Sequence, residues 1–491
     1  MKQPPSVNRN LATGILMFAA FMDLIDVTIV NVALPSIRND LHASPSHLEW
    51  ILSGYTLAFA VLLITGGRLG DIVGRQRIFL LGVAGFTLAS AAACFAGNGD
   101  VLVAARIVQG GFAAMMVPQL ISSVQVMYEP RERAAVFGII GAVSGTAAVI
   151  GPLLGGWLVT SDAFGIGWRS IFLINIPVGI ALFTMAVRSL PNTKSERAPR
   201  LDLPGVALAT TGLFLLVYPL IEGREQGWPA WIWAMFGAST LVLATFIAYE
   251  SRADRQTRGA LLPTHLFANR GFASGLVTQA SFQGSMAGFV LCLIIYVQSG
   301  LGFSAIHAGL VLLPFSLGAF VGVGISAPFG LRLGKVVPFA GAMCQAGGVW
   351  WLARIVGDKG DGLSGWSVTL PMLLAGIGLG LLVVPLIDIA LTTVSPDDAG
   401  AASGTFSTFQ QLGAALGIAI IGAVFFNSVG DDFTSAGLRT ALQDASTWVV
   451  GGYLICAAST LLLPDRKAVQ EHARVQEELL SAQPATSPAA T

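Results

Sequence analysis

Two aspartates and one arginine lie inside long apolar stretches of this sequence, where charged side chains are rare. Asp23 and Asp26 are three residues apart in the first apolar stretch, so a helix places both on one face. A carboxylate at membrane depth is costly unless it is protonated, paired or hydrated. We therefore expect at least one of the two to exchange a proton near physiological pH, which is the chemistry that proton coupling requires.

Arg106 lies in another apolar stretch and keeps its positive charge in any protein environment. Its charge needs an acceptor, and Asp26 or Asp23 on a facing helix is the leading candidate. Two interpretations remain open at this point. The pair is either a structural ion pair, or a pair that loosens when the aspartate is protonated and so couples proton entry to substrate release.

Other polar residues within apolar stretches are weaker candidates. Asp388 is the only acid well inside a C-terminal stretch, so it is a possible second proton site or a side chain that reaches the membrane surface. Amide side chains either line a substrate cavity or hydrogen-bond helices together. The candidates for substrate binding are Asn31, Gln109, Gln279, Gln283, Gln410 and Gln411.

The elements that hold these residues are predicted to be membrane-spanning helices. Hydrophobic residues make up 54% and charged residues 11% of the 491 residues, and the mean hydropathy is +0.72. Fourteen apolar stretches are each about 20 residues long, the length that crosses a bilayer, and the last of them covers 447–463. The composition therefore predicts a polytopic, all-helical membrane protein.

Basic residues set the predicted orientation of these helices. Twenty of them lie in the loops on the same side as the termini, and six lie on the opposite side. Positively charged loops stay in the cytoplasm, so both termini are predicted to be cytoplasmic. The first apolar stretch is too long for the core of a cleavable signal peptide, and we expect it to remain in the protein.

A short charged connection lies between the second and third predicted helices. It carries Gly67, Asp71, Gly74, Arg75 and Arg77 among few other charges. Glycines permit a tight turn, while Asp71 can meet a helix N-terminus and Arg75 a carboxylate or carbonyl group. A cluster that only orients the chain in the membrane is the alternative.

The fifth predicted helix contains the run Gly151-Pro152-Leu153-Leu154-Gly155-Gly156. Its spacing of three and four residues puts small residues on one face, where a second helix could approach closely. Such packing alone says nothing about the direction of transport.

These motifs resemble those of one transporter family. The 67–77 connection matches G-x-L-x-D-x-x-G-R-x-R, the segment from Ile25 to Pro35 resembles L-D-x-T-I-V-N-V-A-L-P, and the segment from Arg106 resembles R-x-x-Q-G-x-x-x-A. The run at Gly151 is similar to G-x-x-x-G-P-x-x-G-G, with Ala147 at the first glycine. Together they resemble the major facilitator superfamily, and within it the fourteen-span drug:proton antiporters.

The resemblance implies two six-helix bundles with two extra helices between them. The expected divisions are an N-terminal bundle over 1–190, linkers and two inserted helices over 191–271, a C-terminal bundle over 272–464, and a cytoplasmic, disordered tail over 465–491. It also implies a gating role for the 67–77 connection and export as the direction of transport.

The expected function is therefore proton-coupled export of a hydrophobic small molecule, such as an antibiotic, dye or secondary metabolite. Export of a specific metabolite, such as an amino acid, siderophore or sugar, is the alternative. The sequence lacks nucleotide-binding and nucleophile motifs, so we expect no enzyme activity, no cofactor and a proton gradient as the energy source. Scattered cysteines and histidines predict no metal site. The expected partners are a small-molecule substrate and the lipid bilayer, without nucleic acid, and the chain is expected to be a monomer.

Overall fold

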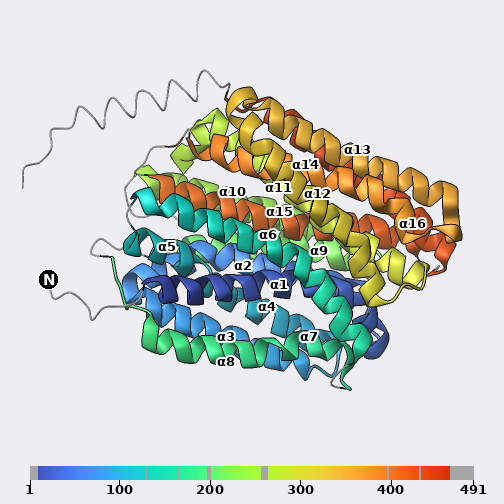
Figure 1. Ribbon diagram of the computed structural model, residues 1–491, viewed down its shortest axis with the longest axis horizontal. Helices are drawn as coiled ribbons and strands as arrows, with labels where there is room; N and C mark the ends of the chain where they lie inside the picture. Colours follow the sequence, from blue (N-terminus) through green and yellow to red (C-terminus); the bar gives the residue numbers. More distant parts are fainter. Residues whose placement is uncertain are drawn as a thin grey trace, which may run out of the picture.

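The computed structural model describes residues 9–128, 130–162, 165–195, 201–255, 262, 264–392, 394, 398–430 and 433–464. Within these ranges the regular structure is entirely helical (Figure 1). The predicted tail over 465–491 lies outside the described residues.

The helices follow the apolar stretches of the sequence. In the first part of the chain they are α1 (Arg9–Leu41), α2 (Pro45–Val73), α3 (Arg75–Cys94), α4 (Gly99–Met116), α5 (Pro118–Met127), α6 (Pro130–Ser161), η1 (Gly167–Arg169), α7 (Ser170–Leu173), α8 (Asn175–Ser189), α9 (Leu203–Glu222) and α10 (Ala230–Arg255). They continue with η2 (Thr264–Ala268), α11 (Arg270–Ile295), η3 (Tyr296–Gly300), α12 (Ala305–Leu333), α13 (Val336–Lys359), η4 (Gly360–Gly362), η5 (Gly365–Val368), α14 (Thr369–Thr392), α15 (Ala399–Val429) and α16 (Ser435–Thr460).

Twelve stretches of the described chain are long and apolar enough to cross a membrane, so the predicted count of fourteen is not confirmed. The two remaining long helices are α6 and α16. The predicted start of the last helix at 447 was wrong, because α16 begins at Ser435. Its first turns are polar but bonded: Gln443 donates to the Ala353 carbonyl (3.4 Å), and Asp444 accepts from Ser428 (2.5 Å).

The long helices pack as two groups that meet along two seams. In the first group α2 packs on α4, α3 on α4 and α8, and α1 on α6; in the second, α14 packs on α12 and α13, α11 on α15, and α16 on α13. The seams between the groups are α2 against α15 and α6 against α12. Figure 1 shows α1, α3 and α8 on one side of the molecule and α13 and α14 on the other.

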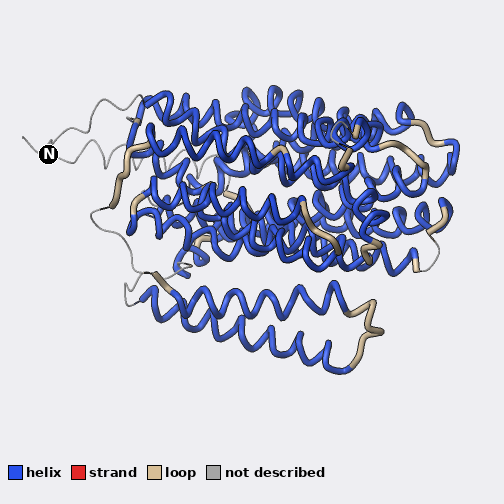
Figure 2. The backbone as a smooth tube through the Cα atoms, turned by 90° about the horizontal axis from the view of Figure 1, so that it is seen from below, coloured by secondary structure: helices blue, strands red, loops and turns tan. Residues whose placement is uncertain are grey.

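Helices α9 and α10 form a hairpin between the two groups in sequence. They pack against each other, and α9 also packs against α2 and α15, so the hairpin lies over the seam between those two helices. In Figure 2 a two-helix hairpin lies along one side of the remaining helices.

The two groups are bonded to each other at one end. Helix α1 begins near the N-terminus and ends at Leu41, and we call the end of the molecule reached by Leu41 the far end (Figure 1). There Gln298 donates to the Val32 carbonyl (2.8 Å), and the Arg38 guanidinium lies 3.6 Å from the ring centre of Phe433.

Candidate functional site

Asp26 is the centre of a buried polar network in the N-terminal group of helices. Its side chain is fully buried, and its Oδ2 accepts from Arg106 Nη1 at 2.5 Å. Its Oδ1 accepts from Gln109 Nε2 at 3.0 Å and from Asn175 Nδ2 at 2.6 Å. The expected pairing of Arg106 with Asp26 is confirmed in its geometry, and the carboxylate has donors from both α4 and α8.

Arg106 is 1% exposed and is held by more than one helix. Its Nη1 also donates to Gln109 Oε1 (2.6 Å), and its Nε donates to the Ile51 carbonyl of α2 (3.2 Å). Its guanidinium lies 4.2 Å from the ring centre of Tyr55. A cation surrounded in this way can stay charged away from water, because carbonyl, amide and aromatic groups replace its hydration.

Asp23 lies beside this network but is not bonded to Arg106. Its carboxylate accepts a hydrogen bond from the Tyr55 hydroxyl of α2, and the side chain is 5% exposed. Since Tyr55 also faces the Arg106 guanidinium, the two aspartates share one environment while having different partners. The shared helix face predicted from their spacing is confirmed.

Sequence reasoning missed three members of the network. Asn175 begins α8, Ser90 lies in α3, and Tyr55 lies in α2. Ser90 Oγ is 2.9 Å from Gln109 Nε2 and 3.4 Å from Asn175 Nδ2. No sequence spacing links these residues to Asp26. The one available indication was Asn175 itself, an amide residue within a predicted apolar stretch.

Of the residues predicted to bind substrate, Gln109 lies within the buried network, and substrate binding by this side chain stays a prediction. It is fully buried and bonded to Asp26, Arg106 and Ser90, so its amide supports the ion pair and does not face a cavity. Asn31 is half-buried and donates to the Val27 carbonyl of its own helix (3.0 Å).

The remaining amides come from α11 and α15, which pack against each other. Gln279 is 2% exposed, whereas Gln283, Gln410 and Gln411 are half-buried. The structure therefore leaves the last three as open candidates for a cavity lining and places Gln279 in the interior of the C-terminal group.

Asp388 is exposed near the end of α14. The neighbouring Val384 and Ile387 are also exposed, whereas Leu386 and Ala390 are buried, so Asp388 lies on the exposed face of a turn whose other face belongs to the core. This position fits a side chain that reaches the membrane surface, and the role of Asp388 as a second proton site stays a prediction.

The charged connection between α2 and α3 is a bonded turn. Asp71 Oδ1 lies 2.8 Å from Arg75 Nη2, and the Arg75 backbone N–H donates to the Thr193 carbonyl (3.0 Å). The Ser195 N–H donates to the Asp71 carbonyl (3.1 Å). Arg75 thus meets a carboxylate, as expected, whereas Asp71 was expected at a helix N-terminus, and the backbone of the turn bonds to the segment that follows α8.

The two glycines and the second arginine of this connection have distinct surroundings. Gly74 has a φ of 122°, and a Cβ there would collide with the Asn192 side chain, so glycine is required. Gly67 is half-buried near Pro118, and Arg77 is exposed. In this conformation the turn is fixed to the linker leading to α9, and its gating role stays a prediction.

The small residues of α6 lie between α1 and α12. A Cβ on Gly151 or Gly155 would collide with Thr28 or Ile29 of α1, and one on Gly156 would lie 2.6 Å from Ile306 Cα of α12. A Cβ on Gly309 of α12 would in turn lie 2.7 Å from the Pro152 carbonyl. The predicted close packing is confirmed, and it lies at a seam between the two groups.

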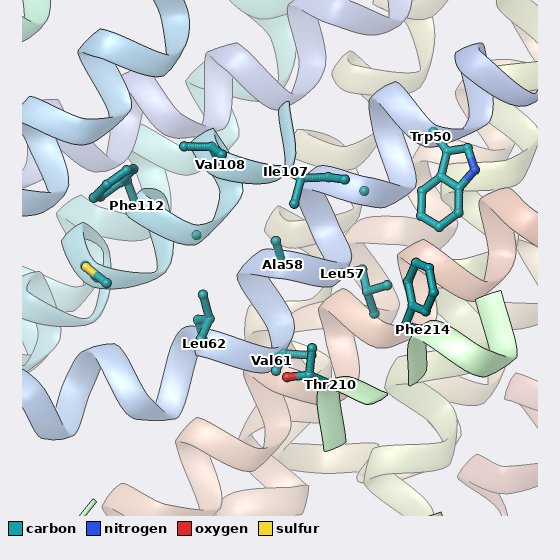
Figure 3. Close-up of a pocket in the computed structure, with 13 residues that line it drawn as sticks. Trp50, Leu57, Ala58, Val61, Leu62, Ile107, Val108, Phe112, Thr210 and Phe214 are labelled. Atoms are coloured by element: carbon teal, nitrogen blue, oxygen red, sulfur yellow. The ribbon is translucent and has the colours of Figure 1, made fainter. Parts of the chain in front are cut away.

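One apolar cavity of about 430 Å³ lies beside the N-terminal group (Figure 3). Residues of α2 and α4 line it together with Thr210 and Phe214 of α9, and Trp50 lies beside Phe214 at one end. None of the residues predicted to bind substrate lines this cavity.

Comparison with known proteins identifies the family. Residues 16–418 match the model of the Major Facilitator Superfamily. The chain belongs to this superfamily. It is accordingly a multi-pass membrane transporter of the superfamily's all-helical fold.

Several members of the superfamily are similar over most of their length. A probable actinorhodin transporter of Streptomyces coelicolor is 40% identical over 475 residues, which cover 96% of this chain and 82% of the relative. The tetracenomycin C resistance and export protein of Streptomyces glaucescens is 34% identical, covering 86% of this chain and 76% of the relative. A puromycin resistance protein of Streptomyces alboniger is 34% identical, covering 93% and 89%.

Solved structures share the fold at low sequence identity. A bacterial homologue of the human lysosomal transporter Spinster superposes with a TM-score of 0.65 at 17% identity, covering 96% of this chain and 99% of the other. A peptide transporter in complex with sulfate gives a TM-score of 0.63 at 16% identity, covering 92% and 95%.

Proposed function

We propose that this superfamily member exports hydrophobic small molecules, such as an antibiotic or other secondary metabolite, in exchange for protons. The relatives named for actinorhodin, tetracenomycin C and puromycin support the substrate class. The observation that carries proton coupling is the fully buried Asp26 carboxylate, which is paired with Arg106 inside a membrane bundle.

The finer architecture belongs to the same proposal. With α6 and α16 counted as spans the chain crosses the membrane fourteen times, which puts both termini on the same side. We assign that side to the cytoplasm, so that the far end faces outward. The excess of basic residues in loops on the terminal side supports this orientation. The bonds between the groups at the far end then describe a state closed to the outside. We expect the transporter to act as a monomer.

Protonation of Asp26 would change what holds α1 to its neighbours. The ionised carboxylate accepts from Arg106, Gln109 and Asn175 and so ties α1 to α4 and α8. A neutral acid loses the ionic attraction to Arg106, whose charge then relies on Gln109 and the Ile51 carbonyl. The strength of the α1 to α4 contact thus depends on a proton, which is what exchange of a proton for a substrate requires.

The test compares wild type with Asp26→Asn in vesicles loaded with a fluorescent efflux dye. Asparagine keeps the shape and accepts one hydrogen bond but cannot exchange a proton. We expect efflux driven by an imposed proton gradient to fall to the level seen with an uncoupler, while dye exchange without a gradient persists. Asp358→Asn, at an exposed acid on α13, is the control and should retain driven efflux.

Undiminished gradient-driven efflux by Asp26→Asn would overturn the assignment of proton coupling. A substrate panel addresses the substrate class separately. If only an amino acid, a siderophore or a sugar moves, the chain is an exporter of a specific metabolite.

A further inference from the structure

A second acid is buried at the seam between the two groups, away from the Asp26 network. Glu49 lies in the first turns of α2 and is 1% exposed. Among the described residues its Oε2 has no hydrogen-bond partner. Its carboxyl carbon lies against α15, where a Cβ on Gly422 would be 2.9 Å from it. Glycine at 422 is what lets the acid pack directly on the opposing backbone.

The last residue of α9 and the loop that follows it contact both sides of the seam near this acid. On the α2 side, Glu222 accepts from the Trp50 indole N–H (3.0 Å), and Glu225 accepts from the Ser46 backbone N–H (2.9 Å) and hydroxyl (3.0 Å). On the α15 side, Arg224 donates to the Phe426 carbonyl (3.3 Å). We call residues 222–225 the seam loop. It joins both groups at the level of Glu49.

The charged groups that face Glu49 do not give it a bonded counter-ion. The seam loop supplies Glu222, Arg224 and Glu225, and α11 supplies the thiol of Cys292. Arg224 is engaged with the Phe426 carbonyl and lies 3.5 Å from Glu225. The two glutamates repel a charge on Glu49, and the α15 residue in contact with its carboxyl group, Gly422, has no side chain that could donate to it.

We infer that Glu49 is a second proton-binding site, one that controls separation of α2 from α15 at the far end. A neutral carboxylic acid fits the closed seam, whereas an ionised one without a bonded donor is costly there. Ionisation therefore favours opening of the seam and entry of water. Protonation from the outside favours closure.

This inference rests on the proposed exchange mechanism and gives it a direction. An acid that closes the far end when it is protonated links proton uptake from outside to the return of an empty transporter. It also gives the inserted hairpin a role, because the seam loop covers the site from α9 and α10.

The test measures the far-end opening itself and needs no substrate. Spin labels at Phe95→Cys on the N-terminal group and Trp366→Cys on the C-terminal group report the distance between them, and both sites are exposed. In wild type in lipid nanodiscs the population with a long distance should rise as pH is raised. In Glu49→Gln it should stay in the short-distance state at all pH values.

Three further variants make the result decisive. Glu49→Asp keeps an acid and should regain the pH response with a moved midpoint, which a merely misfolded site would not do. Asp358→Asn removes an exposed acid of the C-terminal group and should respond as wild type does. Asp26→Asn should keep the far-end response even though it loses driven efflux.

A Glu49→Gln protein that opens with pH as wild type does would overturn the inference and leave the Asp26 proposal intact. Loss of the response in Asp26→Asn, with Glu49→Gln unaffected, would assign the switch to Asp26 and would equally overturn it. Normal driven efflux by Asp26→Asn would instead contradict the proposed function, whatever the labels show.

Discussion

The N-terminal and C-terminal groups of helices are held together by different means. The core of the first contains the ions Asp23, Asp26 and Arg106. Among the described residues from α11 to α16, the buried polar side chains are all neutral, such as Gln279 and Gln345. Among these described residues, buried charge is thus confined to the N-terminal group, and the core of the C-terminal group is built without it.

Close glycine contacts occur in both groups, as Gly66 against the Ala114 carbonyl shows in the first, but in the C-terminal group they occur without buried ions. Gly318 and Gly322 of α12 lie against the backbone of α14, and Gly413 and Gly417 of α15 lie against the backbone of α11. Close backbone contact gives extensive dispersion attraction without polar groups. The comparison teaches that one fold can have buried ion pairs in the core of one half and only neutral side chains in the core of the other.

The largest expected effect comes from breaking the buried ion pair. Arg106→Met leaves the Asp26 carboxylate buried with only Gln109 and Asn175 as donors. We expect the free energy of unfolding to fall by about 3–5 kcal/mol, because an uncompensated buried charge remains. Equilibrium unfolding in mixed micelles measures it.

The matching substitution in the C-terminal group should raise the free energy of unfolding or leave it unchanged. Both amide atoms of Gln345 are buried, and among the described residues they have no hydrogen-bond partner. Gln345→Met should leave stability unchanged or raise it by about 1–3 kcal/mol. Equal losses in Arg106→Met and Gln345→Met would break the comparison between the two groups.

A smaller loss of stability is expected when a close glycine contact between helices is disrupted. Gly322→Ala places a methyl group against the Ile377 carbonyl and 3.0 Å from Gly380 Cα, so α12 and α14 must separate. The expected loss of unfolding free energy is about 1–3 kcal/mol. Gly324, two residues along the same helix, has no atom within 4 Å of a Cβ position. Gly324→Ala is therefore the control, and a similar loss there would show that helix packing is not the cause.

The smallest expected change in stability comes from an ion cluster near the surface, at the start of the C-terminal group. His265 Nδ1 lies 2.9 Å from Asp254 Oδ2 of α10, and its Nε2 lies 3.2 Å from Asp398 Oδ2. Hydrogen bonding to Asp254, and then to Asp398, raises the pKa of His265. A raised pKa stabilises the folded protein below the unfolded value of about 6.5, and this contribution disappears as pH rises through the folded value.

Wild type should thus exceed His265→Gln in thermal stability at pH 5.5, and the difference should shrink toward pH 9. The side chain is half exposed, so we expect less than about 1 kcal/mol. A stability difference that is constant with pH, or that grows as pH rises, would show that the ion cluster contributes through packing only.

Much of the fold could be predicted from the sequence, because bilayer-length apolar stretches must be helices. The predicted stretches lie along helices or runs of consecutive helices, and the largest error is at α16, which begins at Ser435 and not at 447. That error has a physical reason. Polar residues such as Gln443 and Asp444 lower the hydropathy of the first turns of α16. In the structure these side chains are hydrogen-bonded to other helices, which the hydropathy does not show.

The candidate site was predictable only where a residue stands out chemically. The pairing of Arg106 with Asp26 followed from the need of a buried cation for a counter-ion. Asn175, which donates to Asp26, and Ser90, which accepts from Gln109, were missed, since they join the network from helices distant in sequence. Glu49 was missed because the sequence shows an acid near a helix end but not what covers it.

The sequence by itself determined that the chain is helical, that it crosses a membrane, and that a few ions must find partners there, because hydropathy and charge are properties of each residue. Only the tertiary structure decided which partners these are, that Asp388 is exposed and Glu49 buried, and that the 67–77 turn bonds to the segment after α8. Burial and bonding depend on neighbours from other helices, and spacing along the chain does not specify them.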